Sequence, residues 1–278
     1  MTKAGKTTKT KRYSGIQPQY FPRLHYFARI LNTDVFAIRD EAQFVRKHKY
    51  PDGGVDKSYQ AHSPVKQSFG RFLLSIPVHH EGFMPIVSTK IEDSSEWVED
   101  HLKTFKLAYS KASRFDEIFP ELESLLKIRY RNLADLNIAT TLWGLTKVMG
   151  VKKFDKDILN IDKVVELLSK DKIIRLKEVK RSSESESLKN QSLKTNEKIV
   201  ALCKEFGANE DFCGGTAVSA YVDHSLFEKN GITIKVQDWK CKEYPQLFNR
   251  QHGFIANLSI LDLLFNVPGN EARKILIS

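Results

Sequence analysis

Short apolar strands alternate with amphipathic helices at both ends of this chain of 278 residues, and this alternation restricts the fold more than any other feature. Residues 13–16, 23–31 and 34–40 predict a strand, a helix and a strand, which is the pattern of a parallel crossover unit. The same pattern returns near the end of the chain, with strands and helices expected at 197–206, 211–215, 216–229, 232–237 and 258–265. Such alternation is typical of α/β proteins, so we predict a largely parallel, Rossmann-like sheet.

The middle of the chain predicts a helical insertion. Apolar residues recur at helical spacing through much of residues 95–170, and Ser95 is expected to cap the first helix. We expect a single domain over residues 13–278 that contains this insertion. Residues 47–69 predict a loop long enough to be a binding or lid segment, and the serine-rich residues 181–194 predict a flexible surface loop.

Positive charge is concentrated at the N-terminus. The formal net charge is +10, and the five basic residues that precede Tyr13 have no acidic residue among them. We expect residues 1–12 to be a disordered basic tail. Contact with RNA or tRNA through this tail is an alternative that its charge leaves open, although it is not the favoured one.

Several classes of protein are disfavoured. No stretch approaches the ~18 to 20 apolar residues that cross a bilayer, and no secretory signal follows the first residues, so we expect a cytoplasmic protein. The three cysteines form no metal-binding pair, and free thiols are expected. Cys213 beside two glycines is either a nucleophile or a small buried side chain. Because adjacent residues on an extended chain point in opposite directions, His79 and His80 do not suit one metal ion, and we predict no metal site.

In open α/β sheets, ligands bind at the carboxyl ends of the strands. The loops after Ile16, Ile38, Val78, Phe212 and Val236 are therefore the expected walls of a site.

The first of these loops, Gln17-Pro-Gln-Tyr-Phe-Pro22, combines two rigid prolines with amide and phenol groups. Gln17 and Tyr20 would orient a sugar or base there, unless the loop is only a rigid turn with Tyr20 in the core. After the second strand, Asp40 is a candidate general base and Gln43 a candidate ligand contact, whereas helix capping or a solvated turn is the structural alternative. His101 is a further candidate for proton transfer, against an aromatic core stripe that it would share with Trp97.

Two other segments favour phosphate binding. Lys194 and Thr195 directly precede the helix that Asn196 is expected to cap, and a helix N-terminus attracts anions. Gly214 and Gly215 follow a strand and would let the backbone approach a ligand. No Walker motif is present in the sequence, and the sequence leaves any cofactor unidentified.

The chain from about Gly15 to Gly269 resembles the WbqC-like proteins. The resemblance rests on Gln17–Pro22 and, in order, on Asp34-Val35-Phe36, Gln43-Phe44, Leu74–Val78, Trp97 with His101, Lys194-Thr195 with Glu197, Gly214 with Tyr221-Val222-Asp223, Tyr244-Pro245-Gln246 and Phe254–Asn266. It adds Asp223, Gln246 and Asp262 to the candidate substrate-binding residues. The chain departs from the family pattern at Ile16, at Arg23 and at Tyr59–His62.

The resemblance implies a place in bacterial surface-polysaccharide biosynthesis, such as that of the lipopolysaccharide O-antigen. Within that context we expect a transferase that modifies an amino sugar carried on a nucleotide, using an acyl or aminoacyl donor. A non-catalytic protein that binds a nucleotide sugar or a partner is the second hypothesis.

Overall fold

A five-stranded, wholly parallel sheet lies at the centre of the protein. The computed structural model describes residues 9–49, 55–189 and 192–278. The strands follow the order β11-β10-β1-β2-β9. Their bounds are β1 Arg12–Ile16, β2 Val35–Ile38, β9 Glu178–Arg181, β10 Glu210–Cys213 and β11 Thr233–Val236. Counted along the chain, this is the order 3-2-1-4-5 of doubly wound sheets. The predicted α/β fold with a largely parallel sheet is confirmed.

Helices cover both faces of this sheet. Phe36 and Ile38 of β2 pack on one face with α1 (Leu24–Leu31) and the helical middle of the chain. Tyr13 and Ala37 point to the other face, where they pack with α6 (Thr195–Glu205) and α8 (His224–Lys229). The alternation of side chains along a strand therefore divides the apolar residues between two cores.

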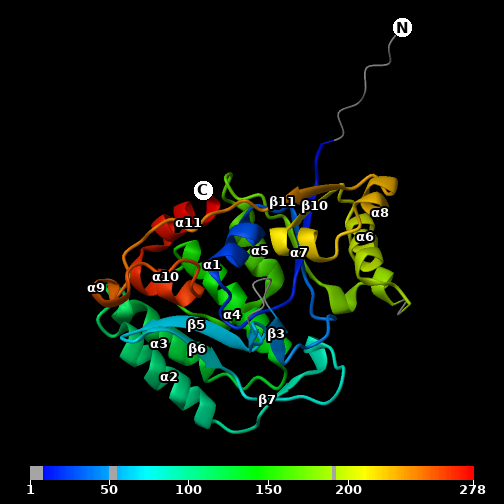
Figure 1. Cartoon of the computed structure of the whole chain (residues 1–278). Helices are drawn as coiled ribbons and strands as arrows, with labels where there is room; N and C mark the ends of the chain where they lie inside the picture. Colours follow the sequence, from blue (N-terminus) through cyan, green and yellow to red (C-terminus); the bar gives the residue numbers. More distant parts are fainter. Residues whose placement is uncertain (1–8, 50–54, 190–191) are drawn as a thin grey trace.

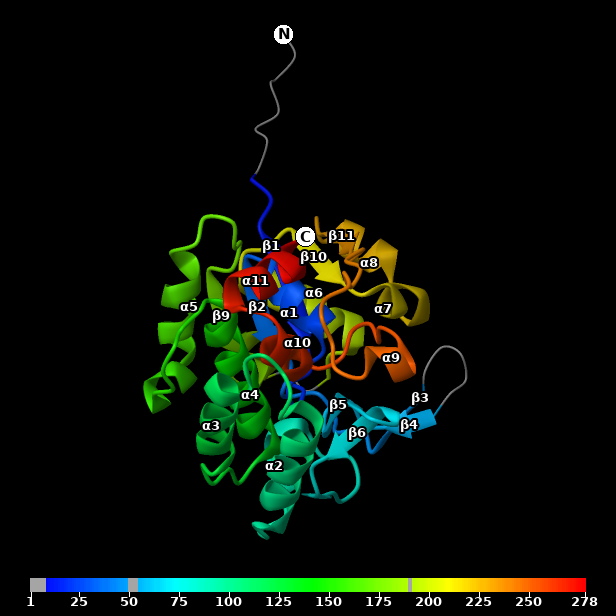
Figure 2. The same cartoon turned by 90° about the vertical axis from the view of Figure 1, so that its left-hand side faces the viewer.

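The predicted helical insertion is present, and it lies beside and below the sheet (Figures 1 and 2). It consists of α2 (Glu96–Tyr109), α3 (Phe115–Leu126), α4 (Leu133–Val148) and α5 (Ile161–Ser169). All of α4 except Asp135 is buried, because α1, α10 (Ile260–Asn266) and α11 (Gly269–Ile277) pack around it. A Cβ on Gly144 would lie 2.7 Å from Cζ of Phe27, so this glycine lets α4 approach α1 closely.

The expected loop over residues 47–69 is instead largely β-structure. It contains β3 (Lys47–Lys49) paired with β4 (Val55–Lys57), and β5 (His62–Gln67) paired with β6 (Gly70–Ser75), while residues 50–54 lie outside the described residues. A further two-stranded sheet pairs β7 (Val78–His79) with β8 (Lys90–Ile91). The polar residues of β5 resemble a loop in sequence, yet all six are buried because distant segments supply their partners. Lys66 shows this, since its Nζ donates to Asn249 Oδ1 and to Gly253 O, each at 2.6 Å.

Two more expectations need correction near the C-terminus. The single helix expected over residues 216–229 is two helices, α7 (Gly215–Ala220) and α8, because Asp223 breaks the run. Its carboxylate accepts hydrogen bonds from the Ser225 and Leu226 amides and so starts α8. A short helix, α9 (Asn249–His252), was not expected.

Among the described residues, no helix combines the length and apolar character needed to cross a membrane.

Candidate functional site

A cleft of about 570 Å³ opens at the carboxyl ends of β1 and β10. The chain leaves β1 toward β2 on one side and later returns to β10 on the other, so these two strands flank the point where the strand order reverses. Doubly wound sheets bind their ligands at this point. Five predicted residues line the cleft: Gln17, Gln43, Lys194, Thr195 and Gly214.

Among the described residues, four basic side chains and two acidic ones line the cleft. The cations are Arg29, Arg39, Lys194 and Lys198, and the acids are Glu41 and Asp211. Arg39 forms an ion pair of 2.6 Å with Glu41, whereas Lys194 and Lys198 make no side-chain ion pair within the described part of the chain. The cleft therefore favours a ligand with negative charge.

Two glycines let side chains approach the backbone at the floor of the cleft. A Cβ on Gly214 would lie 2.8 Å from Nη2 of Arg29, so this glycine makes room for the guanidinium group. Arg29 is also held from the other side, because its Nε donates to Gln237 Oε1 at 2.8 Å. A Cβ on Gly15 would overlap the hydroxyl of Tyr13, which lies over β1 and reaches the cleft.

The floor also holds two buried polar groups that make no hydrogen bond within the described residues. Tyr13 is fully buried and its hydroxyl has no partner. Asp211, its neighbour on β10, is 3% exposed, lines the cleft and makes no hydrogen bond or ion pair. Burial raises the pKa of Asp211 to about 7, although the charges of Arg29 and Arg39 oppose this rise. A carboxyl group with a pKa near neutral pH, facing a cleft, suits proton transfer.

The N-terminus of α6 forms another wall. The helix starts two residues earlier than expected, with Lys194 as its N-cap. The Lys194 amide donates to Glu197 Oε2 at 2.7 Å, and Thr195 occupies the first helical position. Asn196, expected as the cap, instead donates from Nδ2 to Tyr221 O at 2.8 Å. This bond ties the α7–α8 turn to α6, and Tyr221 becomes part of the wall.

A third wall is formed by residues 43–46 and 58–61, which we call the partition. Gln17 is tied to it, because its Oε1 accepts hydrogen bonds from the hydroxyl of Tyr59 and, at 2.7 Å, from Nε2 of Gln60. The fully buried Gln60 also accepts a hydrogen bond from the Val45 amide at 2.8 Å. The partition and the loop after β1 are therefore fixed to one another.

His101 and Tyr20 lie elsewhere, in the core. Nδ1 of His101 is 2.9 Å from the Tyr20 hydroxyl, and Nε2 is 3.1 Å from Ser75 O. Because a carbonyl oxygen can only accept, Nε2 carries the proton and Nδ1 accepts from Tyr20. Burial lowers the pKa of His101 to about 4. Both ring nitrogens are occupied, so the structure gives the pair a packing role and does not bring it to the cleft.

Asp40 is also remote from the cleft. It is fully buried and forms an ion pair of 2.8 Å with Arg181. Its carboxylate accepts two further hydrogen bonds from Ser183, one from the amide and one from the hydroxyl. Asp40 is therefore neither in a solvated turn nor available as a free general base, because Arg181 at the end of β9 and Ser183 after it bind its carboxylate. The next residue, Glu41, lines the cleft in its place.

The remaining candidates stand in structural positions. Gln246 accepts hydrogen bonds from Lys66 Nζ and from the Ile255 amide, each at 3.0 Å. Asp262 is fully buried and accepts a hydrogen bond of 2.8 Å from Tyr244. The bond from Lys66 joins this C-terminal part of the chain to β5, and the other two bonds lie within it. Asp223 caps α8, as described above, and Gly215 begins α7 directly after the cleft-lining Gly214.

Neither a cluster of metal ligands nor an activated thiol is found among the described residues. No group of three or more His, Cys, Asp or Glu side chains could hold a metal ion there. Burial raises the pKa of the Cys213 thiol to about 12, so this side chain stays protonated at the edge of the cleft.

Sequence reasoning missed Tyr13, Arg29, Arg39 and Asp211. The expectation that ligands bind at the carboxyl ends of strands directed attention to the loops. Tyr13 and Asp211 instead lie within strands, and their side chains still line the cleft. Arg29 lies in the last turn of α1. The ordering of β10 beside β1 brings these residues together, and a linear pattern does not contain that information.

These features define the class: a parallel α/β protein with a basic cleft at the switch point of its sheet. The family model of the WbqC-like protein family matches residues 17–274, and the chain belongs to this family. It is also 26% identical over 265 residues to the uncharacterised protein Rv1507c of Mycobacterium tuberculosis (strain ATCC 25618 / H37Rv), covering 94% of this chain and 96% of that protein. No solved structure gives a significant match, so the Rossmann-like assignment stays a prediction.

Proposed function

We propose that this protein is a transferase of glycan biosynthesis that modifies an amino sugar carried on a nucleoside diphosphate. The observation that carries the proposal is the basic cleft at the β1–β10 switch point. Its volume of about 570 Å³ falls in the range of small-molecule sites. A diphosphate is the ligand group that best matches unpaired lysines beside a helix N-terminus.

Each wall has a distinct part in the proposed complex. Lys194, Lys198 and the first amides of α6 would bind the diphosphate, and Arg39, which also lines the cleft, would add positive charge. Gln17 and Gln43 would orient the sugar through hydrogen bonds from the partition side.

The proposed chemistry is acyl or aminoacyl transfer to the amino group. The amine nitrogen attacks the acyl carbon of an activated donor and forms the new C–N bond. The bond between that carbon and the leaving group breaks, and the leaving group departs with the electron pair. The amine proton passes to Asp211, whose pKa of about 7 suits a base at neutral pH. Asp211 thus takes the part for which the sequence offered His101 and Asp40.

Isothermal titration with nucleoside diphosphate sugars that have a free amino group tests the binding step. Lys194→Gln with Lys198→Gln should weaken binding about ten-fold or more, because charge-assisted hydrogen bonds are lost. Lys204→Gln is the matched control, since Lys204 lies on the same helix, is exposed and does not line the cleft. Failure of every such sugar to bind, or equal weakening by the control, would contradict the proposal.

Mass analysis of the bound sugar after incubation with acyl and aminoacyl donors tests the chemistry. A mass increase that Asp211→Asn abolishes while binding persists supports the transferase. Binding without any change in mass supports instead a protein that only binds nucleotide sugars.

RNA contact through the basic tail is the remaining alternative, and residues 1–8 of that tail lie outside the described residues. Salt-dependent RNA binding that is lost on deleting residues 1–12 would favour it.

A further inference from the structure

A second cavity, of about 350 Å³, lies on the far side of the partition from the cleft. Gln43 and Val45 line the cleft, whereas Phe44 and Arg46 line the second cavity. This alternation follows from the extended backbone, whose successive side chains point to opposite sides. The buried side-chain amide of Gln60 holds the two segments of the partition together, because it accepts a hydrogen bond from the Val45 amide and donates one to Gln43 O. The two cavities are therefore separate spaces with one common wall.

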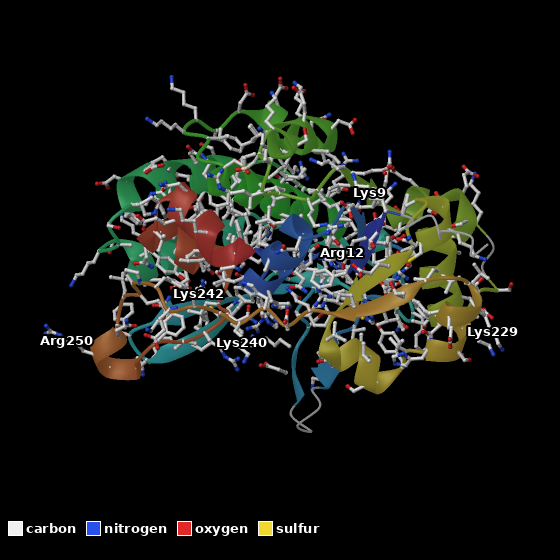
Figure 3. The ribbon with its side chains drawn as sticks, turned by 90° about the horizontal axis from the view of Figure 1, so that it is seen from above. Lys9, Arg12, Lys229, Lys240, Lys242 and Arg250 are labelled. Atoms are coloured by element: carbon white, nitrogen blue, oxygen red, sulfur yellow. The ribbon has the colours of Figure 1, made fainter. Side chains whose placement is uncertain are left out.

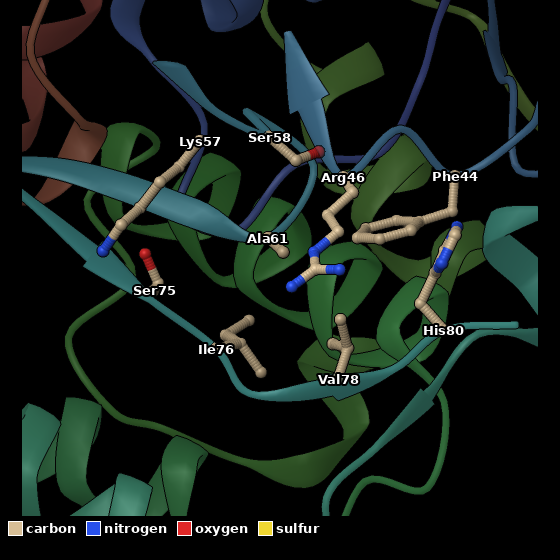
Figure 4. A pocket seen from close by; sticks show the side chains of 9 residues that line it. All are labelled: Phe44, Arg46, Lys57, Ser58, Ala61, Ser75, Ile76, Val78 and His80. Atoms are coloured by element: carbon tan, nitrogen blue, oxygen red, sulfur yellow. The ribbon is translucent and has the colours of Figure 1, made fainter.

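The second cavity is lined by both apolar and basic side chains. Figure 4 shows the Arg46 guanidinium reaching toward the middle of the cavity, opposite Ile76 and Val78. Apolar surface is contributed by Phe44, Ala61, Ile76 and Val78, and the two cations are Arg46 and Lys57. No acidic side chain among the described residues lines this cavity. Its chemistry differs from that of the cleft, which contains two carboxylates.

The polar groups here are available for a ligand. Arg46 and Lys57 are exposed and make no side-chain hydrogen bond or ion pair with the described residues. Ser75 lines the cavity, and its buried hydroxyl also has no hydrogen-bond partner among the described residues. Lys57 and Ser75 point toward each other in Figure 4. Buried polar groups normally have partners, so an acceptor oxygen from a ligand beside Lys57 would complete this arrangement.

We propose that this second cavity binds a small amphiphilic anion, with a carboxylate or phosphate group between Arg46 and Lys57 and an apolar body against Ile76 and Val78. A guanidinium group and an ammonium group both bind either kind of head group. The volume of about 350 Å³ suits a compact ligand with one aromatic ring or a short branched chain. This site goes beyond the nucleotide-sugar cleft and does not depend on the function proposed for it.

Isothermal titration of the full chain with phenyl phosphate, 3-phenylpropionate, inorganic phosphate and the neutral 3-phenylpropanol tests the site. The aromatic anions should bind, and the comparison of the two identifies the preferred head group. Arg46→Gln with Lys57→Gln should weaken their binding about ten-fold or more. Neither side chain makes a hydrogen bond or ion pair with the described residues, so the variant should remain folded.

The matched control is Arg250→Gln with Lys242→Gln. Both residues are exposed, lie in α9 and in the connection before it, and do not line the cavity (Figure 3). This control should change affinity less than about two-fold. The proposal is overturned if neither aromatic anion binds at millimolar concentration, if 3-phenylpropanol or inorganic phosphate binds as tightly, or if the control weakens binding equally.

A steric variant separates this site from the cleft. Val78→Trp places a large ring at the cavity wall and should abolish binding of both aromatic anions, while nucleotide-sugar binding in the cleft remains. Unchanged anion binding in Val78→Trp would contradict the assigned position. Loss of nucleotide-sugar binding in the cleft variants alone would leave the second site intact, so the two proposals fail independently.

Discussion

Replacing Asp211 by asparagine should stabilise the protein above neutral pH. Burial raises the pKa of this carboxyl group from 3.8 to about 7, even after the attraction of Arg29 and Arg39 is included. One pKa unit corresponds to about 1.4 kcal/mol, so keeping Asp211 ionised costs up to about 4 kcal/mol of folding free energy. Asparagine has nearly the same shape and no charge, and it removes this cost.

The raised pKa of Asp211 determines how the stability difference between parent and variant changes with pH. Between pH 4 and 7 the folded state holds a proton on Asp211 that the unfolded state has released. The parent protein therefore loses the contribution of this group as the pH rises through that window, and the loss is complete above pH 7. The gain in the variant should be near zero at pH 4 and largest at pH 8.

Urea denaturation of parent and variant at several pH values measures this difference. Groups that titrate in both proteins, such as the buried histidines, cancel in the comparison. Asp238→Asn is the control, because Asp238 is exposed and lies just after the neighbouring β11, and it should shift stability by less than about 0.5 kcal/mol. If Asp211→Asn is less stable than the parent at pH 8, attraction to the arginines outweighs desolvation, and the reasoning about Asp211 as a base is wrong.

Two predictions concern the core. Burial lowers the pKa of His101 from 6.5 to about 4, so the parent should lose up to about 3 kcal/mol from this group as the pH falls from 6.5 to 4. His101→Gln should flatten that part of the stability profile in urea denaturation, and an unchanged profile would contradict the assignment. Gly144→Ala should lower stability by about 1 to 3 kcal/mol, despite the higher helix propensity of alanine, because the new methyl group overlaps the ring of Phe27. Thermal unfolding tests this with Gly215→Ala as a control, because a methyl group there would make only an ordinary contact of 3.7 Å with Val236, and equal effects of the two changes would disprove it.

Local patterns predicted the elements whose determinants lie within them. The strands at 13–16 and 34–40 and the helix at 23–31 are found almost at the expected positions, because their apolar spacing is a property of the segment itself. Strand β5 was missed for the opposite reason. Its buried Lys66 and Gln67 require partners from α9 and α2, and those partners are far away in the sequence.

The residues of the candidate site show the same difference between local signatures and long-range packing. Lys194, Thr195 and Gly214 could be selected from sequence because a helix start and a glycine turn have local signatures. His101 could not be separated from a core histidine, since only packing shows that Tyr20 and Ser75 occupy both of its nitrogens. The same limit applies to Asp40, which becomes a buried ion-pair partner only when β9 pairs with β2.

The sequence by itself determined the α/β class, the helical insertion and the family, because periodicity and ordered motifs are linear properties. Only the tertiary structure decided which charged side chains meet. The strand order places Asp211 beside Tyr13 and under the influence of the charges of Arg29 and Arg39. The partition separates a cleft with two carboxylates from a cavity that no acidic side chain among the described residues lines. Such effects depend on distance and burial in three dimensions, and neither quantity can be read from the order of residues along the chain.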